Sequence, residues 1–240
     1  MTSFGVMVAV GALVGLWLFR RELRRSRLPD SASDAAIAGV IGGMAGAKLL
    51  WVFEHLREDS LPDLLLSRGG LSWFGGFAGG ILAGLAVMHR KRLPKIAVLA
   101  AATPALAIGH AIGRIGCFLV GDDYGRPSNL PWAVAFPQGL PPTSVPVHPT
   151  QLYEAAALVL VAWLLFRWRT QGRADGFVLG AYLVLAGTLR FLIEFIRVNV
   201  RVLGALSVAH LASLMAIAVG VAFLLRAKPT SQRYRRPPVA

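Results

Sequence analysis

Arginine and acidic side chains recur inside otherwise apolar segments of this chain, at spacings that could do chemistry. Intervals of four, three and four residues separate Arg190, Glu194, Arg197 and Arg201, which places them along one face of a helix. Arg114 closes another apolar segment. A guanidinium can bind a carboxylate or a phosphate through two parallel N–H donors. The pattern favours an anion-binding site, and an internal ion pair of Arg190 with Glu194 is the alternative.

The longest connecting segment, residues 117–149, carries further candidates. It contains the acidic pair Asp122 and Asp123 and ends with His148 before Pro149. Two adjacent acids resemble a metal-binding pair, but no histidine or third acid lies at ligand spacing. We therefore expect neither a metal nor another cofactor. His148 is biased towards an extended backbone by the proline that follows it, and it is either a structural donor or a proton acceptor.

The elements that must position these residues are membrane-spanning helices. The chain of 240 residues is 55% hydrophobic, which excludes the soluble, disordered and secreted classes. Its apolar segments approach or exceed the 17 to 20 residues that span a bilayer. We predict an all-α, polytopic membrane protein with seven transmembrane helices and a periplasmic arm between helices 4 and 5. The segments are 3–19, 34–53, 71–88, 95–113, 150–166, 176–196 and 203–225.

The positive charge of the chain indicates its topology. Lysine and arginine number 25 against 12 acidic residues, and most of them lie in alternate connecting segments. Because basic loops stay in the cytoplasm, we expect a periplasmic N-terminus, a cytoplasmic C-terminus and an outer loop at residues 117–149. Residues 1–227 then form one membrane domain, and residues 228–240 form a basic cytoplasmic tail that contacts membrane lipids. No nucleic-acid partner is expected.

Two other residue types restrict the fold. Cys117 is the single cysteine, so an intramolecular disulfide and a thiolate-cluster metal site are both excluded. The glycines of the second and third apolar segments recur four apart, which permits close helix contact. Gly75 and Gly76 could in addition let a lipid head group approach the backbone.

Three separated motifs resemble the signature of the bacterial prolipoprotein diacylglyceryl transferases. The first spans residues 113–118, 121–122 and 124–127, the second spans 148–154, and the third comprises Arg190, Glu194, Phe195 and Arg197. The resemblance implies an enzyme of the bacterial inner membrane that moves the diacylglyceryl group from phosphatidylglycerol to the lipobox cysteine of a prolipoprotein signal peptide. The second product is glycerol phosphate.

The resemblance also assigns roles to residues. Arginines would stabilise the leaving phosphate, and acids would orient them or assist the thiol. The implied catalytic set is Arg114, Asp122, His148, Arg190 and Glu194. The implied phosphatidylglycerol-binding set is Gly75, Gly76, Tyr124, Gly125, Arg126, Gln151 and Arg197.

At several positions the chain departs from the family pattern. Phe74 precedes the paired glycines, where the family often has histidine or tyrosine that could act as a base. Other departures are Phe4 for tyrosine, Lys48 for arginine, Cys117 for asparagine and Asp122 for glutamate. They are typical of a divergent member, and a non-catalytic lipid-binding or transport paralogue is the alternative function. Because a thiol has an unperturbed pKa of about 8.5, its activation would fall to His148, Asp122 or the arginine field.

Overall fold

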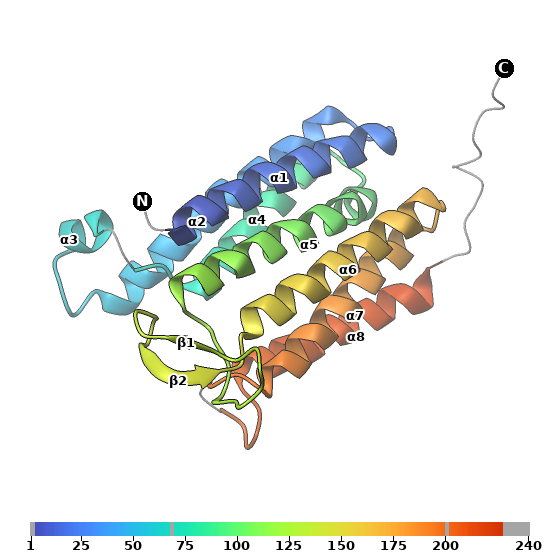
Figure 1. Cartoon of the computed structure of the whole chain (residues 1–240). Coiled ribbons are helices and arrows are strands. Elements are labelled where there is room, and N and C mark those ends of the chain that lie inside the picture. The colour runs from blue at the N-terminus through green and yellow to red at the C-terminus, as the bar shows by residue number, and fades with distance from the viewer. Residues whose placement is uncertain (1–2, 68–69, 200–201, 228–240) are drawn as a thin grey trace. The chain divides into compact units, whose positions relative to one another are not determined.

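Eight α-helices and one short β-hairpin make up the part of the chain that the computed structural model describes, residues 3–67, 70–199 and 202–227 (Figure 1). Residues 228–240, expected as a basic tail, and Arg201 lie outside these residues. The elements are α1 (Ser3–Arg25), a 3-10 turn η1 (Asp30–Ala32), α2 (Ser33–His55), α3 (Leu61–Leu66), α4 (Trp73–Arg90), α5 (Lys95–Val120), β1 (Val134–Phe136), β2 (Thr143–Val147), α6 (Thr150–Thr170), α7 (Asp175–Glu194) and α8 (Val208–Arg226).

The helices agree with a multi-pass membrane protein. Within the described residues, six are long and apolar enough to cross a membrane: α1, η1 with α2, α5, α6, α7 and α8. The seventh expected segment does form a helix, α4, but it has 18 residues and ends on His89 and Arg90. These polar residues lower its mean hydropathy, so the described residues show six candidate spans, and the seventh stays a prediction.

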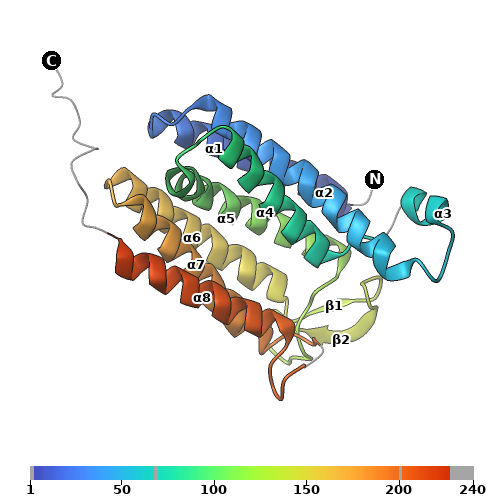
Figure 2. The ribbon, with the colours of Figure 1, turned by 180° about the vertical axis from the view of Figure 1, so that it is seen from behind.

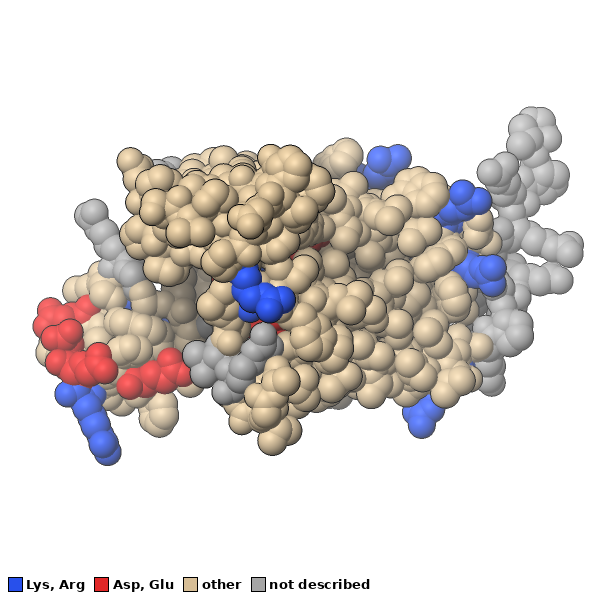
Figure 3. Space-filling model, turned by 60° about the horizontal axis from the view of Figure 1, so that its bottom comes forward, with Lys and Arg blue, Asp and Glu red and all other residues tan. Residues whose placement is uncertain are grey.

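Large apolar side chains cover much of the surface. Leu13, Met44 and Leu225 are among those that the fold leaves exposed. On the face shown in Figure 3, uncharged residues occupy most of the area. Contact with lipid tails accounts for such a surface, because lipid tails are as apolar as these side chains.

The chain divides into two compact units, and residues 19–98 form one of them. Its main contact joins α2 to α4 through facing glycines. A Cβ atom added at Gly75 would lie 2.2 Å from the carbonyl oxygen of Gly46, and one at Gly79 would lie 2.3 Å from that of Gly42. Side chains are excluded at these positions, so the two backbones approach closely, as the glycine spacing predicted.

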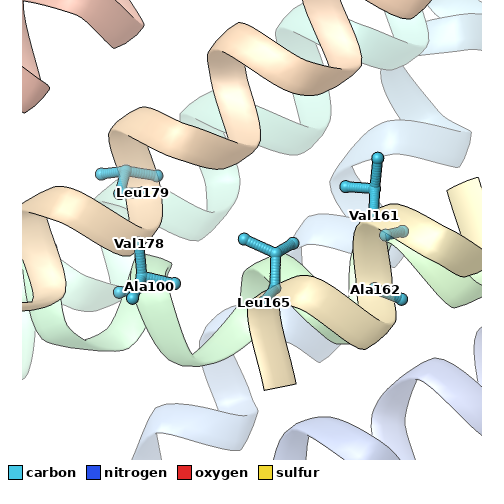
Figure 4. Packing of buried hydrophobic residues seen from close by; sticks show 7 residues of the cluster. Ala100, Val161, Ala162, Leu165, Val178 and Leu179 are labelled. Atoms are coloured by element: carbon cyan, nitrogen blue, oxygen red, sulfur yellow. The ribbon is translucent and has the colours of Figure 1, made fainter. Parts of the chain in front are cut away.

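The described residues among 1–18 and 99–227 form the other unit, in which α5 to α8 lie side by side (Figures 1 and 2). Its hydrophobic core joins α5, α6 and α7, where Ala100, Leu165 and Val178 are fully buried (Figure 4). Facing glycines recur between α7 and α8, because a Cβ atom at Gly180 would lie 2.7 Å from the carbonyl oxygen of Gly220.

Helix α5 contains Pro104, which has no N–H to donate to the carbonyl of Ala100. The hydroxyl of Thr103 donates to that carbonyl at 3.0 Å and satisfies it within the buried core. Helix α5 runs on past this proline to Val120. The loop expected from Cys117 begins four residues later, after Val120, because the intervening residues are apolar enough to prolong the helix.

The connection between α5 and α6 is ordered by a two-stranded antiparallel sheet. Val134 pairs with Val147, and Phe136 pairs with Thr143. Before the sheet, Gly121 and Asp123 adopt φ angles of +68° and +61°. Glycine takes such a left-handed conformation freely and aspartate more readily than most residues, so these two positions can turn the chain sharply at the end of α5.

Candidate functional site

Three arginines and three acids form a closed ring of alternating charge in the unit that contains α5 to α8. We call this set the charge ring, and its members in order are Arg114, Glu154, Arg190, Glu194, Arg197 and Asp123. Helix α5 supplies one member, α6 one and α7 two, while the segments that follow α5 and α7 supply the others. The ring therefore forms only when these three helices are packed together.

On one side of the ring, Glu154 joins two arginines. Its Oε2 lies 2.9 Å from Nε of Arg114, and its Oε1 lies 3.5 Å from Nη1 of Arg190. Nη2 of Arg190 is 2.8 Å from Oε2 of Glu194, which confirms that these two residues form an ion pair. Arg190 has a second acidic partner besides Glu194, because Glu154 also lies within ion-pair distance.

On the other side of the ring, Asp123 joins the two remaining arginines. Its Oδ2 lies 2.7 Å from Nη1 of Arg114, and its Oδ1 accepts a hydrogen bond from Nη2 of Arg197. Nε of Arg197 lies 4.0 Å from Oε2 of Glu194, which closes the ring. Helix α7 ends at Glu194, so Arg197 does not continue its helical face as predicted. Instead its backbone lies in an antiparallel bridge with Gly125.

The start of α6 fixes the turn that carries Asp123. The Thr150 hydroxyl donates to the carbonyl of Asp123 at 2.9 Å, and Nε2 of Gln151 donates to the carbonyl of Asp122 at 2.6 Å. Both donors are fully buried. This clamp holds the left-handed turn in place and directs the Asp123 carboxylate at Arg114 and Arg197.

The part of the loop that follows Asp123 is held mainly through backbone hydrogen bonds. The N–H of Gly125 donates to the carbonyl of His148, and the N–H of His148 donates to the carbonyl of Arg126. A Cβ atom at Gly125 would lie 2.8 Å from side-chain atoms of His148 and Thr150, so glycine is required there. The hydroxyl of Tyr124 donates to the carbonyl of Pro141 at 2.6 Å, while Arg126 is exposed.

Glu194 has the most elaborate support of the three acids. Asn199 Nδ2 and the Ser207 hydroxyl both donate to its Oε1, at 2.7 and 2.6 Å. Ser207 also begins α8, where its side chain and that of His210 form a reciprocal cap of the helix. Glu194 and His210 are completely buried. The end of α7 and the start of α8 are thus joined through one carboxylate oxygen.

Asp122 lies beside the ring, next to Cys117. Burial raises the pKa of its carboxyl above the ordinary value, and the neighbouring Asp123 charge acts in the same direction. Burial also opposes ionisation of Asp123, but the hydrogen bonds and charges of Arg197 and Arg114 outweigh it and lower the pKa of Asp123. Among the described residues, Asp122 forms no ion pair, so the carboxylate between the arginines is that of Asp123.

Cys117, Asp122 and Asp123 also have a geometry that could hold a cation. The Cys117 sulfur and the carboxylate oxygens lie within 4.8 Å of one another. Asp123 already binds two guanidinium groups, however, and Nη1 of Arg114 lies 3.9 Å from the sulfur. A cation there would have to compete with two fixed positive charges.

The remaining candidates, Gly75 and Gly76, belong to the unit formed by residues 19–98. Gly75 is required by its contact with α2, whereas a Cβ atom at Gly76 would meet its nearest atoms at an ordinary 3.4 Å. Phe74, where the family pattern has a base, is half exposed.

Sequence reasoning assigned no role beside the arginines to three residues that the structure places there. Asp123 and Glu154 are members of the charge ring, and His110 lies on α5 one turn before Arg114, within electrostatic range of Arg114, Glu154 and Arg190. The spacing of four residues between His110 and Arg114 was the available signal for the last of these. No local spacing connects Asp123 or Glu154 with their partners.

The three acids of the charge ring use only part of the donor capacity of its arginines. A guanidinium carries five N–H donors, and the ring leaves part of them unused. Nη1 of Arg197 is buried and has no hydrogen-bond partner in the described part of the chain. Ion pairs with the three carboxylates hold the guanidinium groups in defined positions, and donors fixed in this way are suited to stabilising developing negative charge.

Comparison with known proteins gives a consistent result. Residues 1–226 match the family model described as prolipoprotein diacylglyceryl transferase. A curated relative from Clostridium tetani, named phosphatidylglycerol–prolipoprotein diacylglyceryl transferase, is 31% identical over 91% of this chain and 90% of its own length. Relatives of the same name from Bordetella bronchiseptica and Vibrio parahaemolyticus are 32% and 33% identical, over 95% and 92% of this chain and over 92% and 85% of their own lengths.

Proposed function

Because this chain belongs to the prolipoprotein diacylglyceryl transferase family, a family of transferases, we infer that it moves the diacylglyceryl group of phosphatidylglycerol to a cysteine thiol of a prolipoprotein. The observation that carries the assignment to this site is the charge ring, which holds three guanidinium groups in fixed positions. The acceptor is the lipobox cysteine of the prolipoprotein signal peptide.

We propose that Arg114 and Arg190 stabilise the leaving phosphate. In the reaction the acceptor sulfur bonds to the glyceryl carbon, the bond between that carbon and the phosphate oxygen breaks, and its electron pair stays with glycerol phosphate. This leaving group needs positive charge more than it needs a proton. The side chain of Arg190 is 25% exposed, so it is the most accessible of the three arginines.

The other residues have supporting roles in this proposal. Asp123, Glu154 and Glu194 orient the arginines, and Gln151 holds the turn that carries Asp123. Arg197 keeps its implied role in head-group binding, and its Nη1 donor is unpaired but buried in the described part of the chain. Tyr124, Gly125, Arg126 and His148 form the loop wall against which the head group would lie, and Asp122 is a candidate to assist the thiol. Gly75 and Gly76 remain candidates for head-group contact on α4.

We further propose that the protein crosses the bacterial cytoplasmic membrane seven times, with α4 as the additional span. In the unit with the charge ring, α6 and α8 end on Arg167, Arg169 and Arg226, whereas the ring gathers where α6 begins and α5 and α7 end. Basic helix ends favour the cytoplasm. The ring would then face the periplasm, the N-terminus would be periplasmic and the C-terminus cytoplasmic.

The alternative, a non-catalytic lipid-binding or transport paralogue, is not favoured, because the curated relatives are named as transferases. The deciding experiment incubates the purified protein with phosphatidylglycerol and a lipobox peptide and measures the peptide by mass spectrometry. We expect a diacylglyceryl mass increase. Arg114→Ala and Arg190→Ala should each lower the rate at least tenfold, about 1.4 kcal/mol in the barrier. Phosphatidylglycerol binding without any product would support the alternative instead.

A further inference from the structure

His110 is an ionisable residue deep inside a membrane-spanning helix. It lies ten residues before Val120, the last residue of α5. At a rise of 1.5 Å per residue, this places it about 15 Å from that end of the helix, near the middle of a hydrocarbon core about 30 Å thick. Ionisable side chains at this depth are costly, so they normally face a partner, a cavity or a substrate path.

The charged neighbours of His110 are members of the charge ring. Arg114 follows it by one helical turn, and Glu154 and Arg190 act on it from α6 and α7. Helix α1 also packs on this part of α5, since a Cβ atom at Gly11 would lie 3.0 Å from the carbonyl oxygen of Gly109. The residues of α1 up to Leu18 carry no titratable side chain. Two cations and one anion of the ring therefore act electrostatically on His110.

The face of α5 that carries His110 is open. His110 is exposed, Leu106 one turn earlier is 53% exposed, and a Cβ atom added at Gly113 would meet nothing within 4 Å. No hydrogen bond of the His110 imidazole is present within the described residues. A substrate group that reaches Arg114 along this face would pass the imidazole.

The other candidates for thiol activation are engaged elsewhere. The imidazole of His148 already has a partner, because its Nδ1 lies 3.5 Å from the Tyr153 hydroxyl. Asp122 is packed against Cys117. The side chain of Phe74 has no atom that can accept a proton. Among these residues, His110 combines a proton acceptor, an open face and proximity to both arginines assigned to the phosphate.

We propose that His110 accepts the proton of the acceptor cysteine, an inference that rests on the transferase function proposed above. The S–H bond breaks as the imidazole nitrogen takes the proton, and the sulfur then bonds to the glyceryl carbon. The carbon–oxygen bond to the phosphate breaks with its electron pair on oxygen. The proton passes from the imidazolium to glycerol phosphate or to water, which returns His110 to its neutral form. No further reactant is needed.

The test compares cysteine and selenocysteine at the lipobox position. A selenol ionises far more readily than a thiol and does not need a base. With the cysteine peptide, we expect His110→Gln to lower turnover at least thirtyfold, because glutamine has a similar size but cannot take the proton. With the selenocysteine peptide, the same variant should be within threefold of wild type. His89→Gln, at the opposite end of α4 from Phe74, is the matched control and should change neither rate.

A second variant distinguishes loss of the proton acceptor from misfolding. His110→Ala leaves space for a free base, so added imidazole should restore turnover of the cysteine peptide at least fivefold. Equal losses of His110→Gln with both peptides, or no rescue of His110→Ala, would overturn the proposal. Wild-type rates in His110→Gln would also overturn it. A pH–rate profile whose fall in turnover towards acidic pH disappears only in His148→Gln would assign the proton to His148. No product from the wild-type protein would instead refute the transferase function itself.

Discussion

The carboxylate of Glu154 bridges Arg114 and Arg190, with its two oxygens 2.9 and 3.5 Å from their nitrogens. The contact joins α5 to α7 through α6, and Glu154 is 1% exposed. Removing one partner of a buried ion pair leaves an uncompensated charge, at a cost of about 3 to 5 kcal/mol.

We therefore expect Glu154→Gln to disturb both arginines at once. Transfer to the lipobox peptide should fall at least tenfold, and the thermal unfolding midpoint should fall by several degrees. The exposed Glu54 of α2 supplies the control, Glu54→Gln, which should leave both quantities unchanged. Equal turnover of the two variants would show that the charge ring does not need this bridge.

Asp123 should make the stability of the folded protein depend on pH. Its pKa is lowered in the folded protein, so between the folded and unfolded values the unfolded chain binds more protons. The stabilisation is complete above the ordinary aspartate pKa of about 4 and is lost as the pH falls through the lower folded value.

Thermal unfolding in detergent between pH 6 and pH 3 measures this effect. Asp123→Asn should lower the midpoint at pH 6 and flatten its decline towards pH 3, because no carboxylate remains to be protonated. Asp59→Asn, at an exposed position, should keep the wild-type slope. A slope that is the same in all three proteins would contradict the role of Asp123 as an ionised bridge.

Local sequence spacing predicts only part of this site. The interval of four residues indicated an ion pair of Arg190 with Glu194 as the alternative to an anion-binding site, and the structure has this pair because both residues lie on one helix. Asp123 and Arg197 are 74 residues apart, and their contact depends on the turn after Val120 and on the end of α7. Apolar length likewise located seven helices but not all their ends, because α5 continues beyond Arg114 to Val120. Helix ends and loop paths are decided by tertiary contacts that a single segment does not contain.

The Ser207 hydroxyl should matter for activity through Glu194. It donates to Oε1 of Glu194 at 2.6 Å, whereas the equally buried Ser213 donates only to the carbonyl of Ala209 in its own helix. Ser207→Ala and Ser213→Ala each delete one buried hydroxyl of the α8 region. We expect Ser207→Ala to lower turnover at least fivefold and Ser213→Ala to stay within twofold of wild type. Recovery of turnover in Ser207→Thr would separate the hydrogen bond from a packing effect.

Neighbouring glycines of α4 should respond differently to a methyl group. At Gly75 the added Cβ would lie 2.2 Å from a backbone oxygen of α2, but at Gly76 its nearest atoms are at 3.4 Å. Overpacking typically costs about 1 to 3 kcal/mol. Gly75→Ala should therefore lower the unfolding midpoint, and Gly76→Ala should leave it nearly unchanged. A stable Gly76→Ala protein with weaker phosphatidylglycerol binding would place the lipid head group at Gly76, and unchanged binding would remove it from the site.

Cys117 lies next to the charge ring, and a double displacement through its thiol is chemically conceivable. Its sulfur is 3.9 Å from Nη1 of Arg114, a cation that favours a thiolate. A thioether formed on the enzyme would, however, be a poor leaving group for the second transfer. The side chain is also 8% exposed, which suits a small packing residue at the end of α5.

We therefore predict that Cys117 is not a covalent nucleophile. Cys117→Ser and Cys117→Asn should keep turnover of the lipobox peptide within about threefold of wild type, since neither needs more than local repacking. Intact-protein mass spectrometry during turnover should show no lipid adduct on the wild-type enzyme. A diacylglyceryl group trapped on Cys117 that passes into the peptide product when fresh acceptor is added would establish the double displacement instead.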